Sequence, residues 1–446
     1  MAWGDTNTHR FIQRSSKRVD HGECTGPNHL GPYSFRGLNP SKLIDQWTAY
    51  WSALRRRERD DLIEVFRARI DRRIDPVLRS WLGWICASIL LFKVVVYGLA
   101  WLNSASVDAR FFEGSKPRID FNRIKPGVLN LASQDVLWYL EIVSRGYSSG
   151  RDSGAFYPAW PFFLRWIGCA DSAWSPLIAA GASTVFWCLG LMVVFHWASR
   201  TLSRPVAWSM VLANLLLPSS MTFWIGFTES LFFFLFVSFM AFADDRRLWV
   251  SWVAAILLPI TRPVGVFVVI IPGVWWLLGH RRAFAAKCIV GFFLGWSIYF
   301  GIMWHHLGHP FAGWAAQRFH VNAPSLAYVT DLPRFLASLC HVTSFHDPTG
   351  SLLDRLVFIA SFWGVVRLWR IRPSWCVATA AMLLIPAMTN QFLSFSRFSI
   401  VAIPLLLPIG QTLLRLRPRW LCLCVGLSLA TQYHLIHRFF SFGWGT

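Results

Sequence analysis

Long apolar stretches recur along the chain from about residue 80 onward, with short polar loops between them. Each stretch approaches the roughly 20 residues that an α-helix needs to cross a bilayer. The strands of a membrane barrel would instead alternate apolar and polar residues over about ten positions, and these stretches do not. Because a backbone in lipid must satisfy its own hydrogen bonds, the pattern predicts an all-α, polytopic membrane protein.

We expect about eleven membrane-spanning helices. They are placed near residues 81–102, 173–197, 205–223, 229–243, 248–261, 264–279, 284–304, 352–371, 375–389, 398–416 and 420–437. The short pair between 248 and 279 is also compatible with one broken helix, because Arg262 and Pro263 interrupt it.

The region before the first span is polar and basic. Residues 1–40 are rich in Gly, Asn, Ser and Arg and are expected to form a disordered cytoplasmic tail. Residues 41–79 combine apolar positions with many arginines, which predicts a basic amphipathic helix lying on the cytoplasmic membrane surface. A solvated, charged arm is the alternative. The multi-pass transmembrane domain is expected to cover residues 80–446.

The basic residues of the short loops predict the orientation of the chain, because cytoplasmic loops carry an excess of Lys and Arg. The loops in the more basic set are expected to be cytoplasmic; this set holds Arg200, Arg204, Arg246, Arg247, Arg281, Arg282, Arg370, Arg372, Arg415, Arg417 and Arg419. The N-terminus is then cytoplasmic. The long loop 103–172 is external and is expected to carry short interfacial helices.

The formal net charge of +20 raises the question of a nucleic-acid partner. The arginines lie mainly in the N-terminal arm and the short loops, a placement typical of orientation signals and of contacts to anionic lipids. No recognisable nucleic-acid-binding module accompanies them. We therefore expect membrane lipids, with anionic lipids at the basic arm, and no nucleic acid.

Asp135 is the leading candidate for chemistry. It is a lone carboxylate among aromatic residues in the external loop, at the expected start of a short interfacial helix. A carboxylate there can act as a general base toward an acceptor hydroxyl. Stabilising the positive end of a helix, or plain solvation, is the structural alternative.

Three further charged residues are expected on the same external side. Glu229 opens an apolar stretch, where a buried acid is costly unless it is paired or faces a cavity. Arg262 is expected either to pair with Glu229 or to bind a phosphate, since its planar fork suits both. Arg397 begins a later span and is either a ligand contact or an interfacial anchor.

The external loops also hold polar and aromatic candidates. Gln317 and Arg318 are plausible contacts to a sugar or a phosphate. His305, His306, His309 and His320 are close in sequence, but no carboxylate or cysteine completes an obvious metal site. We expect neither a metal nor a cofactor. The segment AFYPAWPFFLRWIG, taken alone, is also typical of an aromatic belt at a membrane surface.

Taken in order, these segments resemble the PIG-V-type mannosyltransferases. The stretch from Asp135 to Tyr147 followed by AFYPAWP resembles the first-loop signature of that family. WIGFTESLFFF, ITRPVG, GHPFAGWAAQRFH and SRFSIVAIPL are similar to its later motifs. The resemblance covers about residues 81–437. Gln134 departs from it, standing where an aromatic commonly precedes the acid, and Val264 replaces a frequent Asn.

The resemblance implies a multi-pass transferase of the GT-C class that uses a polyprenyl- or dolichyl-phosphate sugar, with mannose as the donor sugar in the best-known members. It implies that Asp135 is the catalytic base. The remaining candidate substrate contacts are Trp138, Tyr139, Tyr147, Tyr157, Glu229, Arg262, Gln317, Arg318 and Arg397.

The expected function is inverting sugar transfer to a lipid- or glycan-linked acceptor on the non-cytoplasmic face. The alternatives are a transporter or flippase of lipid-linked sugars and a non-catalytic subunit of a glycosylation complex. The sequence contains no N-x-[ST] glycosylation sequon, which favours a bacterial cytoplasmic membrane over the endoplasmic reticulum.

Overall fold

The computed structural model describes residues 40–57, 76–103, 123–149, 152–170, 172–320, 325–347, 350–389, 392 and 394–441. Within these ranges the secondary structure is helical, and the sole β-type pairing is one bridge between Ser344 and Ser351. The all-α prediction is thereby confirmed for the described part of the chain.

The α-helices are α1 Pro40–Arg57, α3 Pro76–Asn103, α4 Asp135–Arg145, α5 Ala159–Trp166, α6 Ser175–Thr201, α7 Arg204–Leu215, α8 Glu229–Asp244, α9 Leu248–Thr261, α10 Ile270–Leu277, α11 Arg282–Leu307, α12 Ala312–His320, α13 Ala327–Thr330, α14 Leu332–Cys340, α15 Leu352–Trp369, α16 Pro373–Ala387, α17 Phe395–Ser399, α18 Leu406–Leu413 and α19 Pro418–Phe440. Short 3-10 helices connect them: η3 Pro126–Leu131, η4 Gly146–Ser149, η5 Asp152–Ala155, η6 Pro218–Phe223, η7 Pro263–Val269 and η8 Ile403–Leu405.

Three of these helices are long and apolar enough to cross a membrane: Trp81–Leu102 within α3, all of α6 and all of α11. Shorter apolar helices occupy 248–261, 263–277, 373–387 and 403–413. A helix of 14 residues such as α9 is about 21 Å long at 1.5 Å per residue, less than the roughly 30 Å of a hydrocarbon core. The count of eleven spans therefore stays a prediction.

Several expected spans are interrupted in the structure. The stretch 205–223 divides into α7 and η6, and the stretch 398–416 divides into α17, η8 and α18. The stretch 264–279 begins as η7 and continues as α10. A proline is the first residue of η6 (Pro218) and of η7 (Pro263) and the second residue of η8 (Pro404). Proline lacks an N–H and clashes with the preceding turn, which kinks or breaks an α-helix, and the expected spans are interrupted at these points.

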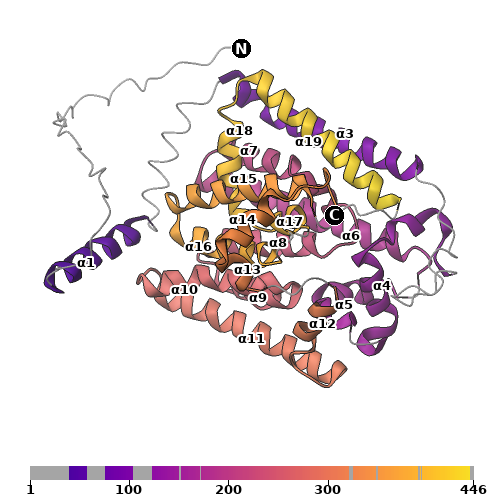
Figure 1. The fold of residues 1–446 in the computed structure, drawn as a ribbon, viewed down its shortest axis with the longest axis horizontal. Helices are drawn as coiled ribbons and strands as arrows, with labels where there is room; N and C mark the ends of the chain where they lie inside the picture. The colour runs from indigo at the N-terminus through magenta and orange to yellow at the C-terminus, as the bar shows by residue number, and fades with distance from the viewer. Residues whose placement is uncertain are drawn as a thin grey trace, which may run out of the picture. The chain divides into compact units, whose positions relative to one another are not determined.

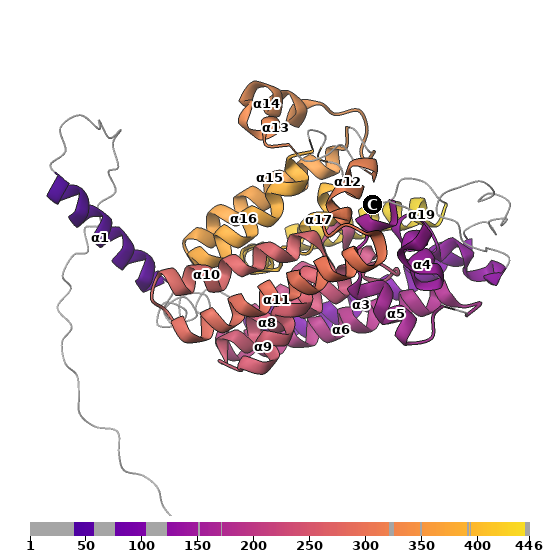
Figure 2. The ribbon, with the colours of Figure 1, turned by 90° about the horizontal axis from the view of Figure 1, so that it is seen from below.

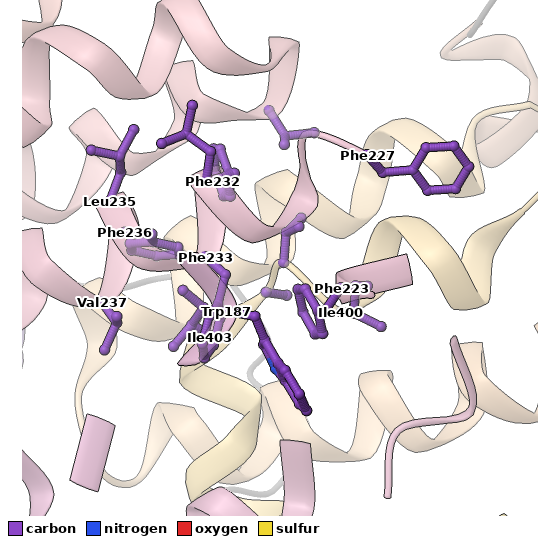
Figure 3. Packing of buried hydrophobic residues seen from close by; sticks show 14 of the residues in the cluster. Trp187, Phe223, Phe227, Phe232, Phe233, Leu235, Phe236, Val237, Ile400 and Ile403 are labelled. Carbon is purple, nitrogen blue, oxygen red and sulfur yellow. The ribbon is translucent and has the colours of Figure 1, made fainter. Parts of the chain in front are cut away.

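Helices α6, α8, α9 and α11 pack against one another in that order (Figures 1 and 2). Nearly every residue of α8 is buried, which places this helix at the centre of the packing. Figure 3 shows aromatic side chains of α8 meeting Trp187 of α6 and Phe223 of η6. The Trp187 and Phe223 rings stack with centroids 5.9 Å apart.

Helix α3 packs along α19 and α7 (Figure 1). Its Lys93 is fully buried. The ammonium donates to the carbonyl oxygen of Leu215 at 3.0 Å and to the hydroxyl of Ser220 at 2.7 Å. These contacts join the first candidate span to the segment between α7 and η6.

The chain divides into two compact units, Met1–Tyr50 and Trp51–Thr446. In the first unit, α1 exposes Trp47 and Tyr50. In the region 41–79, predicted as one amphipathic helix, α1 ends at Arg57, residues 58–75 lie outside the described residues and α3 begins at Pro76. The place of the predicted helix on a membrane surface stays a prediction. The predicted disordered tail also lies outside them, except for Pro40.

Candidate functional site

Four charged side chains that are far apart in the sequence meet in one group, which we call the charged cluster: Asp135, Glu229, Arg262 and Arg397. Arg397 Nη2 lies 2.6 Å from Asp135 Oδ2, and Arg397 Nε donates to Glu229 Oε1 at 2.6 Å. Arg262 Nη1 lies 2.9 Å from the same Glu229 oxygen. Two carboxylates and two guanidiniums balance in formal charge, as buried charges require.

Three of the four members of the charged cluster sit where a helix begins or ends. Asp135 is the first residue of α4 and Glu229 is the first residue of α8. Carboxylates are favourable at these positive ends of helices. Arg262 follows α9 in an extended conformation, and Arg397 lies in the five-residue α17. The cluster is therefore assembled from the ends of α4, α8 and α9 and from the short helix α17.

Two non-glycine residues beside the cluster have a left-handed backbone. Gln134, directly before Asp135, has a φ of 53°, and Ser394, which caps α17, has a φ of 51°. Non-glycine residues rarely adopt this conformation, and such strain concentrates at functional sites. It fixes the directions in which α4 and α17 present Asp135 and Arg397.

A close approach of the backbone positions Arg262. A Cβ atom at Gly265 would lie 2.2 Å from the carbonyl oxygen of Leu258, so only glycine fits this tight connection between α9 and η7. The hydroxyl of Thr228 donates to the carbonyl oxygen of Thr261 at 3.4 Å, which ties the start of α8 to the end of α9. Glu229 and Arg262, the next residue in each segment, are thereby held side by side.

Burial differs sharply within the charged cluster. The Glu229 side chain is 0% exposed and the Arg262 side chain 7%, whereas Asp135 is 34% exposed beside Arg397 at 6%. Asp135 is thus the member that solvent or a ligand can reach. No described group pairs with its Oδ1 atom. The position of Asp135 in the first turn of α4 also fits the alternative role of stabilising the positive end of that helix. Because the buried Arg397 holds its Oδ2 atom, Asp135 is more than a solvated cap.

Two buried polar atoms of the cluster have no hydrogen-bond partner among the described residues: Glu229 Oε2 and Arg262 Nε. Buried polar groups nearly always find a partner, so unsatisfied ones point to a ligand or to function. Of the two alternatives for Arg262, the ion pair with Glu229 is present, and it leaves Nε available as a donor. The interfacial-anchor alternative for Arg397 is wrong, because this residue is buried and doubly paired.

Aromatic rings cover the guanidiniums. Arg397 lies 4.0 Å from the centroid of the Phe227 ring, and Arg262 lies 5.6 Å from that of Phe398. Figure 3 shows the Phe227 ring pointing away from the rings of Phe232, Phe233 and Phe236. These cation–π contacts stabilise the charge of the arginines where water is excluded.

Of the aromatic residues of α4, Tyr139 lies near the charges of the cluster. Tyr139 is buried, and Trp138 is half-buried with its ring stacked on Phe156 at 5.5 Å. Burial raises the pKa of Tyr139, and the charges of Asp135 and Glu229 add to the effect. Its phenol is therefore neutral at physiological pH and able to donate a hydrogen bond.

Three other residues predicted to contact the substrate instead make contacts within the protein that hold its loops and short helices together. Tyr147 donates to the carbonyl oxygen of Phe156 at 2.6 Å, and Tyr157 stacks on Tyr299 at 4.4 Å. The Gln317 amide donates to the carbonyl oxygen of Ala155 at 2.9 Å, which ties α12 to η5. Arg318 belongs to α12, and its side chain lies outside the described residues.

The loop histidines do not gather into a metal centre in the described part of the chain. The rings of His305 and His306 lie 4.9 Å apart, and His309 accepts from the backbone N–H of Phe311. Within the described ranges, no three His, Cys, Asp or Glu residues are close enough together to hold an ion.

A second layer behind Arg397 was missed by the sequence analysis. Asp354, fully buried in the first turn of α15, accepts from the backbone N–H of Ser396 at 2.6 Å. His346 Nδ1 lies 3.6 Å from Asp354 Oδ2. Burial lowers the pKa of His346. The available signal was an acid among the apolar residues of SLLDRL, which resembles an ordinary helix start and carries no indication of its partner.

No family model matches the chain, and its sequence matches no curated protein. The chemistry of the charged cluster is therefore argued from its atoms. It presents one accessible carboxylate oxygen, one unpaired buried acceptor and one unpaired buried donor. This set can take a proton from a hydroxyl and can bind an anion beside it.

Proposed function

We propose that this chain is a membrane glycosyltransferase that acts on the non-cytoplasmic face of its membrane. Its donor is a polyprenyl- or dolichyl-phosphate sugar, and mannose is the sugar that the PIG-V resemblance suggests. Its acceptor is lipid- or glycan-linked, and a bacterial cytoplasmic membrane is favoured over the endoplasmic reticulum. The observation that carries the proposal is the accessible Asp135 carboxylate, held at one oxygen by the buried Arg397.

In the proposed reaction, Asp135 Oδ1 takes the proton of the acceptor hydroxyl while that oxygen attacks the anomeric carbon of the sugar. The bond from this carbon to the lipid-phosphate oxygen breaks, and the lipid phosphate leaves with its electron pair. Attack from the face opposite to the leaving group inverts the configuration. A positioned general base typically contributes 10²- to 10⁴-fold to such a step.

The other members of the cluster have separate roles in this proposal. Arg397 fixes the carboxylate, so that one oxygen faces the acceptor. The unpaired Arg262 Nε is a donor suited to the departing phosphate, and the unpaired Glu229 Oε2 is an acceptor suited to a sugar hydroxyl. The neutral Tyr139 phenol adds a donor at the same place.

The test is Asp135→Asn in purified protein supplied with a labelled polyprenyl-phosphate sugar and an acceptor extract. We expect transfer to fall by at least about 100-fold, because the amide cannot accept the proton. Asp245→Asn is the matched control. Asp245 also pairs with an arginine and is 32% exposed, at the opposite end of α8. Full transfer by Asp135→Asn would refute the catalytic base.

A transporter or flippase of lipid-linked sugars is the second candidate, supported by the buried Glu229–Arg262 pair. Reconstitution into vesicles separates the two functions, because an enzyme forms a new labelled product and a carrier only redistributes the label across the bilayer. A non-catalytic subunit would do neither, and Asp135 would then be dispensable.

A further inference from the structure

A groove runs between α6 and α8 at the end of α8 opposite to the charged cluster. Its volume is about 490 Å³, within the range of small-molecule sites. Apolar side chains of both helices line its length: Leu189, Met192, Val193, Phe234 and Phe242.

The groove starts where α6 and α8 touch. At Gly190 a Cβ atom would lie 2.4 Å from the Phe233 ring, so the two helices approach as closely as glycine permits. Beyond that point the lining residues continue to Thr201 of α6 and to Asp245, which directly follows α8. Trp197 forms part of the wall and is held by a hydrogen bond of 2.9 Å from its Nε1 to Asp244 Oδ2. The groove therefore extends from this contact to its open end at the C-terminal ends of both helices, where Arg200 and Arg247 are exposed.

Basic side chains stand at the open end. His196, Arg200 and Arg247 line it together with a single acid, Asp245. The two arginines and the one aspartate of this rim sum to a formal charge of +1. Arg200 pairs with Asp245 at 3.2 Å, but its side chain is 58% exposed. Such an exposed pair is weak and easily exchanged for another anion.

Arg247 is exposed, and no carboxylate in the described ranges pairs with it. An apolar groove ending in a net positive rim matches an acyl chain joined to a phosphate. Further basic residues lie near this end of α8: Arg281 donates to the carbonyl oxygen of Ala243 at 2.8 Å, and Arg282 follows it as the first residue of α11. Clustered basic residues of this kind attract the anionic lipids of a membrane leaflet.

We propose that this groove binds one anionic phospholipid, with an acyl chain between α6 and α8 and the phosphate beside Arg247 and Arg200. This site is independent of the proposed sugar transfer. Zwitterionic lipid should bind less well, because its choline or ethanolamine cancels the charge that the rim selects.

The test is native mass spectrometry of the purified full-length chain with an equimolar mixture of phosphatidylglycerol and phosphatidylcholine. Wild-type protein should retain phosphatidylglycerol preferentially. Arg247→Gln should lower that preference by about fivefold, the effect of one basic residue near a membrane surface. Arg246→Gln is the matched control, because this neighbour is exposed but does not line the groove.

Two further measurements keep the proposal falsifiable. Val193→Phe should fill the groove and lower retention of both lipids, since the chain and the phosphate bind together. In wild-type protein, added salt should weaken the phosphatidylglycerol preference by screening the rim, whereas excess inorganic phosphate should not displace the lipid.

Equal lipid preference in wild type and Arg247→Gln would overturn the proposal. So would a dimer in the spectra that Val193→Phe abolishes, because the groove would then be covered by a second copy of the chain. Displacement of the lipid by inorganic phosphate alone would likewise overturn it, since the acyl chain would contribute nothing.

Discussion

The two ends of α8 each lie beside an aspartate–arginine ion pair, and the two pairs differ in the arginine. Asp135 and Asp245 are almost equally exposed, at 34% and 32%. Arg397 is 6% exposed and also binds Glu229, whereas Arg200 is 58% exposed. A buried, doubly bound arginine holds its aspartate in one place. An exposed arginine leaves the pair free to open for another anion.

The buried acids at these ends differ in the same sense. Asp244 uses both oxygens, accepting from Arg372 at 3.2 Å and from Trp197 at 2.9 Å. Glu229 receives both of its arginines on one oxygen and leaves the other without a described partner. A satisfied carboxylate joins helices, and an unsatisfied one indicates a site where a ligand completes the bonding. Along the 16 residues of α8, the two acids are separated by about 22 Å at 1.5 Å per residue.

Substitution of the two arginines gives the largest expected contrast. Arg397→Gln leaves Glu229 and Asp135 without this partner, and removing one member of a buried ion pair typically costs about 3–5 kcal/mol of unfolding free energy. Arg200→Gln should cost less than about 1 kcal/mol, because its pair is exposed. Thermal unfolding in detergent, followed by tryptophan fluorescence, measures both. Equal losses would show that the two ends do not differ as described.

Substitution of Asp354, in the second layer behind Arg397, is expected to give the next largest loss of stability. Asp354→Ala removes the carboxylate that accepts from the Ser396 N–H, and losing a hydrogen bond to a charged group should cost about 1.5–3 kcal/mol. Asp354→Asn keeps an acceptor oxygen and should lose less. The same unfolding assay applies, together with sugar transfer. If Asp354→Ala unfolds as wild type does, Arg397 is positioned without this layer.

Substitution of Tyr139 is expected to have the smallest effect on stability at neutral pH. Because burial raises the pKa of its phenol, unfolding above pH 10 is favoured by ionisation of the unfolded chain. Stability should fall as pH rises there, by at most about 1.4 kcal/mol per pH unit from this residue. Tyr139→Phe should lose part of that dependence and change stability little below pH 9. An unchanged slope between pH 10 and 11 would contradict this.

Apolar runs located the long helices well, because burial in lipid demands about 20 apolar residues. The runs 81–102, 173–197 and 284–304 correspond to α3, α6 and α11. The same signal failed for 205–223 and 398–416, since apolar composition reports burial and not continuity. Pro218 and Pro404 are the sequence signals for these breaks, because proline kinks or breaks a helix.

The site was predictable as a set of residues and not as a set of contacts. Composition and the order of motifs singled out Asp135, Glu229, Arg262 and Arg397. A sequence pattern cannot state that Arg397 joins Asp135 to Glu229, because that contact depends on how α4, α8 and α17 pack. Asp354 was missed for the same reason, as its significance lies in a backbone N–H from another element.

The buried Lys93 has a consequence for the biogenesis of the chain. Its acceptors, Leu215 O and Ser220 Oγ, are made more than 120 residues later on the ribosome. An unpaired ammonium near the middle of a newly inserted segment costs about 2.5–3.5 kcal/mol. As a candidate membrane span, α3 is therefore expected to remain loosely held, near the translocon, until residue 220 has followed it.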